Sequence, residues 1–218
     1  MNKVKSLYSL NDLLNENIGW RKKELSTLLA LVASASNHEK NILLRSSICA
    51  LYAHWEGFIK QAAIGYLSYV ENRGLSHKDL TPNMVAMGLR AEFERVENTH
   101  QVTRRIDLTS YLLSDLSRKA IIDPETAVNT RDNLNSTVLL EILHSLAIDY
   151  RPYITKSPLI DQRLLENRNG IAHGERRQIE EADYVELQGV MIGLMEQFRN
   201  DIETAAQEER FRRAAKPI

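Results

Sequence analysis

The stretch LRSSICALYAHWEGFIKQAAIGYLSYV, residues 44–70, decides the fold class. Its apolar residues recur at intervals of three and four, which is the spacing that gathers side chains on one face of an α-helix. The sequence predicts one long helix from about Glu39 to Glu71. Trp55 and Phe58 continue the apolar stripe, so we expect both in the core rather than at a binding surface.

Helical spacing also dominates on both sides of this stretch. Nine Gly and five Pro are too few for the many tight turns of a β-sandwich. The middle differs, because residues 99–135 are polar and mixed: we predict an irregular insertion with a short helix around Tyr111 to Leu116, and residues 101–108 are compatible with an extended segment. Further helices are expected from a cap at Ser9 to about Val32, from Pro82 to about Val96, over Ser136–Ile148, from Pro158 onward and over Glu181–Glu208. The sequence therefore predicts a single all-α domain over residues 1–218.

Composition narrows the class of protein. The 218 residues include 28 Lys and Arg against 29 Asp and Glu, and this net charge of −1 argues against bulk electrostatic binding of nucleic acid but leaves room for a local basic site. The single cysteine, Cys49, excludes an intramolecular disulfide and a zinc site built mainly from thiolates. The N-terminus lacks an apolar signal and every apolar run is too short to span a bilayer, so we expect a cytoplasmic protein without a membrane partner.

One segment stands apart from an otherwise ordinary helical sequence. No GxxxxGK[ST], HExxH or GxSxG motif occurs, and the six histidines are scattered, so we expect neither a metal nor a cofactor. The segment LLENRNGIAHG, residues 164–174, instead ends an amphipathic helix in a compact group of Arg168, Asn169 and His173.

These three side chains suit phosphate chemistry. Arg168 offers a planar, permanently charged fork for a phosphodiester, and His173 titrates near neutral pH and can move a proton. Asn169 can hold a phosphate oxygen or fix the imidazole tautomer. Because no metal is expected, the substrate must carry its own nucleophile, and RNA carries one in its 2′-hydroxyl.

Helix geometry leaves the convergence of these groups open. Arg168 and His173 lie about 140° apart around an ideal helix, whereas Asn169 and His173 share a face. Either Gly170 and Gly174 let the backbone depart from ideal geometry, or a two-fold axis brings the same segment from a second chain. A plainer alternative is that Arg168 and His173 are simply basic residues near a helix C-terminus, where the helix dipole favours them.

Three blocks together resemble a known family. RNGIAHG, residues 168–174, resembles the RxxxxH signature of the HEPN superfamily, in which the residue after the arginine is typically Asn, Asp or His. Residues 44–70 and NLNSTVLLEILHSLAID, residues 133–149, extend the resemblance to MAE-type HEPN-like nucleases, in the same order along the chain. The resemblance implies an antiparallel helical bundle, usually dimeric. It also implies metal-independent endoribonuclease activity, often in a toxin–antitoxin or phage-defence system.

The resemblance also implies roles for particular residues. Arg168 would bind and stabilise the scissile phosphate, and His173 would deprotonate the 2′-hydroxyl or protonate the leaving 5′-oxygen. Asn169 would be the supporting polar residue. The expected partners are then an RNA substrate, a second copy of the chain, and an antitoxin or defence-system protein.

Other residues are candidates for the same site. Glu56 orients Arg168 or His173 in one reading and forms an exposed ion pair with Lys60 in another, and the sequence leaves both open. Basic residues near the motif are candidates for an RNA path: Arg163, Arg176 and Arg177. The alternative function is a non-catalytic HEPN helical module that binds a partner protein or a nucleotide in a defence or regulatory complex.

Overall fold

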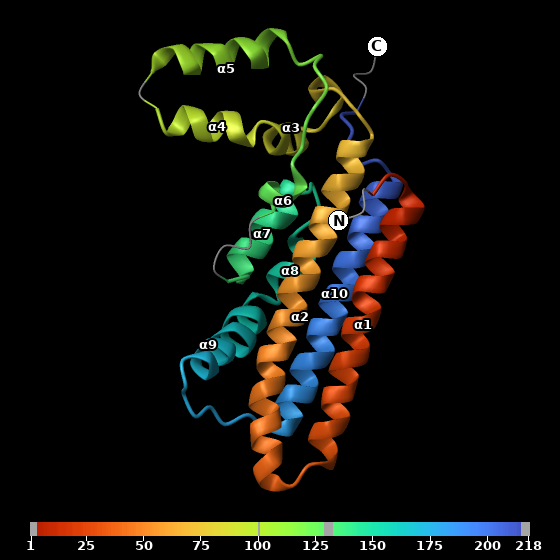
Figure 1. Cartoon of the computed structure of the whole chain (residues 1–218), viewed down its shortest axis with the longest axis vertical. Coiled ribbons are helices and arrows are strands. Elements are labelled where there is room, and N and C mark those ends of the chain that lie inside the picture. The colour runs from red at the N-terminus through yellow and green to blue at the C-terminus, as the bar shows by residue number, and fades with distance from the viewer. Residues whose placement is uncertain (1–3, 100, 129–132, 215–218) are drawn as a thin grey trace.

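Three long helices form the body of the protein. The computed structural model describes residues 4–99, 101–128 and 133–214, which include α1 (Leu7–Ser34), α2 (Asn37–Asn72) and α10 (Glu181–Gln207). The three helices lie side by side, with α1 antiparallel to α2 and α10 running in the same direction as α2 (Figure 1). An ion pair of 2.7 Å between Lys40 and Glu181 joins the first turns of α2 and α10. The prediction of an all-α helical bundle is confirmed.

The apolar stripe of α2 forms the centre of the core. Trp55 and Phe58 are fully buried, as predicted, in one apolar cluster with Leu25 of α1 and Phe198 of α10. Burying a side chain of this size contributes about 1.5–3 kcal/mol relative to leaving it exposed. Helix α2 is therefore held on several sides at once, which makes it a rigid support for residues on its remaining face.

A second group of helices packs beside α2. It consists of α7 (Ser136–Ser145), α8 (Arg151–Ile154), a π-helix η2 (Leu159–Leu165) and α9 (Glu166–Ala172). The Asp161 carboxylate accepts hydrogen bonds from the backbone N–H of Ser136 at 2.7 Å and from its hydroxyl at 2.5 Å. This link fixes the start of α7 against the segment that leads into α9.

The insertion contains an arm that projects from the bundle (Figure 1). We call residues 82–114 the arm, and they comprise α3 (Pro82–Gly88), α4 (Arg90–Glu97) and α5 (Val102–Ser114). A short helix η1 (His77–Asp79) precedes the arm, and α6 (Pro124–Ala127) follows it. Neither α4 nor α5 contains a buried residue.

The boundaries predicted from sequence need correction in the arm. The extended conformation considered for residues 101–108 is not present, because these residues lead into and begin α5, which runs from Val102 to Ser114 rather than from Tyr111 to Leu116. Its β-branched residues obscured a helical spacing that Leu108 and Tyr111 in fact follow. The single helix predicted from Pro82 to Val96 is divided at Leu89.

Elsewhere the predicted helices are present with small shifts. The first begins at Leu7 because Ser6, not Ser9, is the N-cap: the Ser6 hydroxyl accepts a hydrogen bond from the Ser9 backbone N–H at 3.1 Å. The helix expected after Pro158 begins as the π-helix η2 before it becomes regular. In the part of the chain that the structure describes, no helix is long and apolar enough to cross a membrane.

Candidate functional site

The RNGIAHG segment lies on a regular helix that ends at its histidine. Helix α9 continues from η2, and His173 is its C-cap residue, with its backbone N–H donating to the Asn169 carbonyl oxygen at 2.9 Å. Gly174 follows in the left-handed conformation, φ +84°, which a glycine adopts without strain. Because α9 is regular through Gly170, the backbone does not turn Arg168 toward His173. Of the two predicted routes to convergence, the one that relies on Gly170 is therefore not seen.

Arg168 is half-buried and held on several sides. Its guanidinium carbon lies 4.5 Å from the centre of the Tyr52 ring, which is within the range of a cation–π contact. Its Nη1 donates hydrogen bonds to the side-chain oxygens of Asn133 at 2.8 Å and Asn169 at 2.7 Å. These partners are uncharged, so they orient the guanidinium without neutralising it.

Tyr52 forms the wall behind Arg168 and is almost completely buried, with 1% of its surface exposed. Its hydroxyl accepts a hydrogen bond from the Leu134 backbone N–H at 2.7 Å. Burial is the main reason that the pKa of Tyr52 rises to about 12; the Leu134 hydrogen bond and the Arg168 charge oppose the rise, and the nearby Glu56 carboxylate adds to it. The phenol is therefore neutral at physiological pH.

One face of α2 carries the residues that surround Arg168. Arg45, Cys49, Tyr52 and Glu56 are spaced four, three and four residues apart, so they form a single stripe. Burial raises the pKa of the Cys49 thiol, and the positive charge of Arg168 opposes that rise. The effect of Glu56 on the Tyr52 hydroxyl places Glu56 at the other end of the same stripe. Among the described residues no ion pair joins Glu56 to Lys60, so the geometry favours the reading that puts Glu56 near the motif.

His173 and Asn169 have different surroundings. The His173 side chain is exposed at the end of α9, where it can meet a large substrate or a second protein chain. Asn169 is half-buried, and its side-chain oxygen is used by Arg168. Asn169 therefore supports Arg168, although it shares a helix face with His173.

The three arginines predicted to line an RNA path differ in whether they form ion pairs. Arg163 forms ion pairs with Glu186 at 2.9 Å and Asp183 at 3.7 Å, which tie η2 to α10. Arg177 forms ion pairs with Glu175 at 2.7 Å and Glu166 at 3.8 Å. Arg176 is exposed, and no ion pair of the described residues includes it. An RNA strand would meet Arg176 first and would have to displace carboxylates from the other two.

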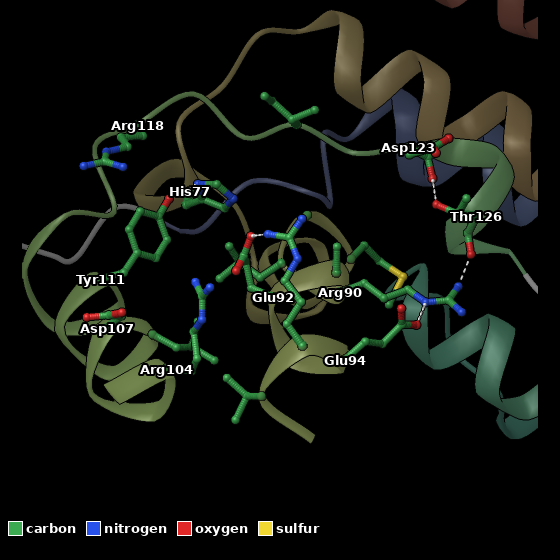
Figure 2. A pocket seen from close by; sticks show the side chains of 18 of the residues that line it. His77, Arg90, Glu92, Glu94, Arg104, Asp107, Tyr111, Arg118, Asp123 and Thr126 are labelled. Atoms are coloured by element: carbon green, nitrogen blue, oxygen red, sulfur yellow. Dashed lines mark hydrogen bonds and ion pairs between the residues drawn. The ribbon is translucent and has the colours of Figure 1, made fainter. Parts of the chain in front are cut away.

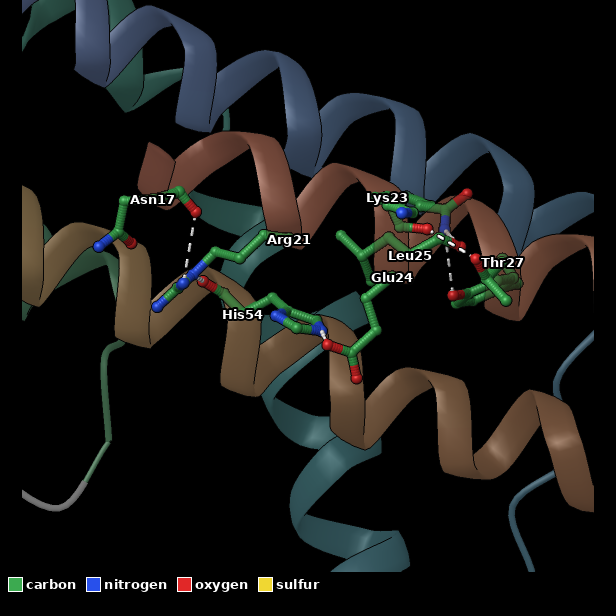
Figure 3. A network of polar contacts seen from close by, with 9 residues as sticks. Asn17, Arg21, Lys23, Glu24, Leu25, Thr27 and His54 are labelled. Carbon is green, nitrogen blue, oxygen red and sulfur yellow. Dashed lines mark hydrogen bonds and ion pairs between the residues drawn. The ribbon is translucent and has the colours of Figure 1, made fainter. Parts of the chain in front are cut away.

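A buried polar network joins α1 to α2 (Figure 3). Arg21 is only 3% exposed and donates from Nε to the His54 carbonyl oxygen at 3.1 Å and from Nη1 to the Asn17 carbonyl oxygen at 3.4 Å. The His54 ring in turn faces Glu24 at 3.6 Å. Burial lowers the pKa of both Arg21 and His54, with Glu24 opposing the change. The contacts of this network are internal to the bundle, so we assign it a structural role.

A cavity lies in the arm, away from the motif (Figure 2). It measures about 880 Å³ and lies between α4, the inner face of α5 and the segment that follows. Three of its arginines are paired with carboxylates: Arg90 with Glu94 at 2.7 Å, Arg95 with Glu92 at 2.6 Å and Arg118 with Asp115 at 2.5 Å. Arg104 also lines the cavity. At one end, the Tyr111 hydroxyl and Nδ1 of His77 share a hydrogen bond of 2.7 Å.

Metal ligands do not cluster in the part of the chain that is described. Within residues 4–99, 101–128 and 133–214, no group of three or more His, Cys, Asp or Glu side chains is arranged to hold a metal ion.

The fold is an all-α bundle, and α9 with its C-cap carries Arg168, Asn169 and His173. These features define a helical domain of the RxxxxH class. The family model described as HEPN_MAE_28990/-like HEPN matches residues 10–211, and the chain therefore belongs to this HEPN family. This confirms the resemblance found in the sequence. Membership indicates a nuclease or a nucleotide-binding helical module, and HEPN domains are generally RNases. No curated protein and no solved structure matches the chain.

Proposed function

We propose that this protein is a metal-independent endoribonuclease that cleaves RNA through its 2′-hydroxyl. Arg168 binds the scissile phosphate and stabilises the negative charge that grows on it in the transition state. His173 takes the proton from the 2′-hydroxyl or gives one to the leaving 5′-oxygen. The 2′-oxygen bonds to phosphorus as the 5′-oxygen leaves, so the products are a 2′,3′-cyclic phosphate and a 5′-hydroxyl.

The environment of Arg168 is the observation that carries this proposal. The guanidinium is fixed by the Tyr52 ring and by two side-chain amides, at 4.5, 2.8 and 2.7 Å. A preorganised cation in a partly dry site stabilises developing charge far better than a mobile one in water. A basic residue retained only for the helix dipole would need none of these partners.

We further propose that the active form is a homodimer. Arg168 and His173 diverge by about 140° on a regular helix, so one chain does not direct both at the same phosphate. A two-fold axis beside α9 would place the exposed His173 of one chain near the Arg168 of its partner, and it would supply one imidazole as base and one as acid. Arg176 would then lie along the approach of the RNA backbone.

The biological setting that we propose is a toxin–antitoxin or phage-defence system. It rests on the family resemblance, since active HEPN nucleases with this motif commonly serve there. Such an enzyme needs an inhibitor or trigger, which would be the partner protein. Expression should arrest bacterial growth, and Arg168→Ala should relieve the arrest.

RNA cleavage in the presence of EDTA tests the activity directly. We expect wild-type protein to produce fragments with cyclic phosphate ends, and Arg168→Ala and His173→Ala to lose at least about a hundredfold in rate. RNA carrying a 2′-O-methyl group at the cleaved position should resist cleavage. His38→Ala is the matched control, because His38 is an exposed histidine at the start of α2. Cleavage that survives His173→Ala, or that needs a divalent metal, would rule the mechanism out.

The arm favours a second candidate function, a non-catalytic module that binds a partner protein. Val102, Ile106 and Leu113 are 63%, 57% and 82% exposed on α5, where large apolar side chains gain little unless something covers them. Under this alternative His173→Ala would weaken assembly with the partner, and RNA would remain intact. Copurification and RNA cleavage measured on the same variant separate the two functions.

A further inference from the structure

We propose that Tyr52 is the positioning residue that fixes the guanidinium of Arg168 against the segment before α7. This inference rests on the proposed RNA cleavage for its catalytic consequence. The placement of Arg168 itself can be tested without any activity. Tyr52 does not touch the substrate in this proposal and acts only through Arg168.

The ring of Tyr52 contacts the guanidinium of Arg168 directly. The guanidinium carbon of Arg168 lies 4.5 Å from the Tyr52 ring centre, and the ring is nearly completely buried. An arginine side chain has many rotamers, and ordering it carries an entropic cost at the moment a phosphate binds. A fixed aromatic face removes much of that freedom beforehand, and the charge remains available for an anion.

The hydroxyl of Tyr52 also helps to hold Arg168, through the segment before α7. The hydroxyl accepts from the Leu134 backbone N–H at 2.7 Å, and the preceding residue, Asn133, accepts from Arg168 Nη1 at 2.8 Å. Tyr52 therefore holds Arg168 in two ways: its ring contacts the guanidinium, and its hydroxyl anchors the backbone that presents Asn133. A phenylalanine could supply only the first of these.

A second buried tyrosine of α2, Tyr66, provides a comparison. Tyr66 is also fully buried on α2, yet its hydroxyl has no hydrogen-bond partner among the described residues. A buried tyrosine hydroxyl in this core thus does not have to be satisfied by its neighbours. The hydrogen bond to Leu134 is specific to Tyr52 and to its place beside the motif. Tyr66→Phe is consequently a matched control for Tyr52→Phe.

The ionisation of Tyr52 separates a positioning role from a role as acid or base. With its pKa raised to about 12, chiefly by burial, the Tyr52 phenol stays neutral over the whole range in which an RNase would be assayed. A tyrosine that acted as acid or base would change the shape of the pH–rate profile when replaced. A positioning tyrosine should lower the profile without changing its shape.

Cys49 provides a readout of Arg168 that is independent of catalysis. It is the single cysteine of the chain, it is half-buried, and the charge of Arg168 favours its thiolate. Burial raises the pKa of this thiol and the Arg168 charge opposes the rise, so at unchanged burial the pH midpoint of its alkylation by iodoacetamide reports how close the guanidinium lies. The maximal alkylation rate reports access to the thiol, so the two effects are separable.

The experiment compares Tyr52→Leu, Tyr52→Phe, Tyr66→Phe and Arg168→Gln. We expect Arg168→Gln to raise the alkylation midpoint, Tyr52→Leu to reproduce most of that rise, and Tyr66→Phe to leave it unchanged. In the RNA assay we expect kcat to fall about tenfold in Tyr52→Phe and about a hundredfold in Tyr52→Leu, with KM within about twofold of wild type and the shape of the pH profile retained.

The outcomes distinguish this proposal from the proposed function. If Arg168→Gln raises the midpoint and Tyr52→Leu does not, Tyr52 does not position Arg168, even if RNA is cleaved. If Tyr52→Leu raises the midpoint but no RNA is cleaved, the positioning stands and the nuclease function fails. If Tyr66→Phe lowers kcat as much as Tyr52→Phe, the effect is general core loosening and the proposal is overturned. Tyr52→Phe retains the ring in the core, so it provides a folded variant if Tyr52→Leu unfolds.

Discussion

The motif in the bundle and the cavity in the arm hold their arginines differently. In the bundle, Arg168 is oriented by an aromatic ring and two amide oxygens, all uncharged. In the arm, Arg90 and Arg95 each bond to a carboxylate on their own helix. The cavity beside them has a volume of about 880 Å³, but the better-prepared cation is at the motif.

This difference teaches which feature indicates an anion site. An arginine already paired with a carboxylate must give up that pair before it can bind a phosphate, whereas one held by neutral groups needs no exchange. The supporting structure differs as well, because the site rests on α2, whose other faces are packed in the core, whereas α4 and α5 contain no buried residue. A site that needs fixed geometry is better supported by the bundle.

The largest expected effect comes from replacing one arginine in each region by lysine. Arg168→Lys keeps the charge but loses the planar fork that stacks on Tyr52, so we expect RNA cleavage to fall by about a hundredfold or more. Arg104→Lys in the arm cavity should leave the rate within about twofold of wild type. A loss in Arg104→Lys with the rate of Arg168→Lys unchanged would mean that the cavity, not the motif, is the functional site.

A leucine from each region should show the same contrast in stability. Leu143 of α7 is completely buried, and Leu143→Ala should lower the free energy of unfolding by about 2–5 kcal/mol. Leu113 of α5 is 82% exposed, and Leu113→Ala should change it by no more than about 0.5 kcal/mol. Urea unfolding of the two variants measures both. A large loss in Leu113→Ala would show that the arm is covered in solution, as the partner-binding alternative requires.

The bundle and the motif could be predicted because their signals are local. Arg168, Asn169 and His173 lie within two turns of one helix, and the 44–70 stretch shows a clear helical period. Tyr52 was hidden because a tyrosine in an apolar stripe looks like any core residue. Its place between Arg45, Cys49 and Glu56 at helical spacing was the one available signal. The sequence contains no comparable signal for Asn133. Its role depends on where the segment before α7 lies in the fold, and that segment shows no helical or strand period.

The arm was harder to predict for a related reason. A helix that packs on a core shows one apolar face in its sequence. The apolar side chains of α5 are instead divided between two faces, and neither face is buried. Leu108 and Tyr111 face the cavity, whereas Ile106 and Leu113 are exposed. Without a single buried face, the period is too weak to distinguish a helix from an extended segment.

Two glycines test how tightly the chain packs over the motif. A Cβ on Gly170 would lie 2.5 Å from Arg177 Nε and 2.8 Å from a Glu175 oxygen, whereas one on Gly189 of α10 would meet nothing within 4 Å. Gly189→Ala should therefore stabilise the protein by up to about 1 kcal/mol, which is the gain in helix propensity. Gly170→Ala should gain about 1 kcal/mol less, because Arg177 has to move from its carboxylate partners. Equal gains in urea unfolding would show that Arg177 does not cover α9.

The smallest expected effect is the pH dependence that His77 gives to the base of the arm. Burial lowers the pKa of His77 and its Nε2 has no partner among the described residues, so protonation would put a buried charge beside Gly88. The unfolded chain then binds the proton at higher pH than the folded one. The contribution of His77 to stability is therefore complete above the unfolded pKa of about 6.5 and is lost as pH falls below it.

His77→Gln should reduce the loss of stability between pH 7.5 and 5.5, by no more than about 1.4 kcal/mol for each pH unit. His38→Gln, at an exposed histidine of the bundle, should leave that loss as it is in wild type. Hydrogen exchange in α5 should respond first, because the Tyr111 hydroxyl is bonded to the His77 ring at 2.7 Å. If α5 exchange is the same at both pH values while α2 exchange rises, then His77 does not secure the arm. The pH sensitivity would in that case belong to the bundle, where a second buried histidine, His54, lies between α1 and α2.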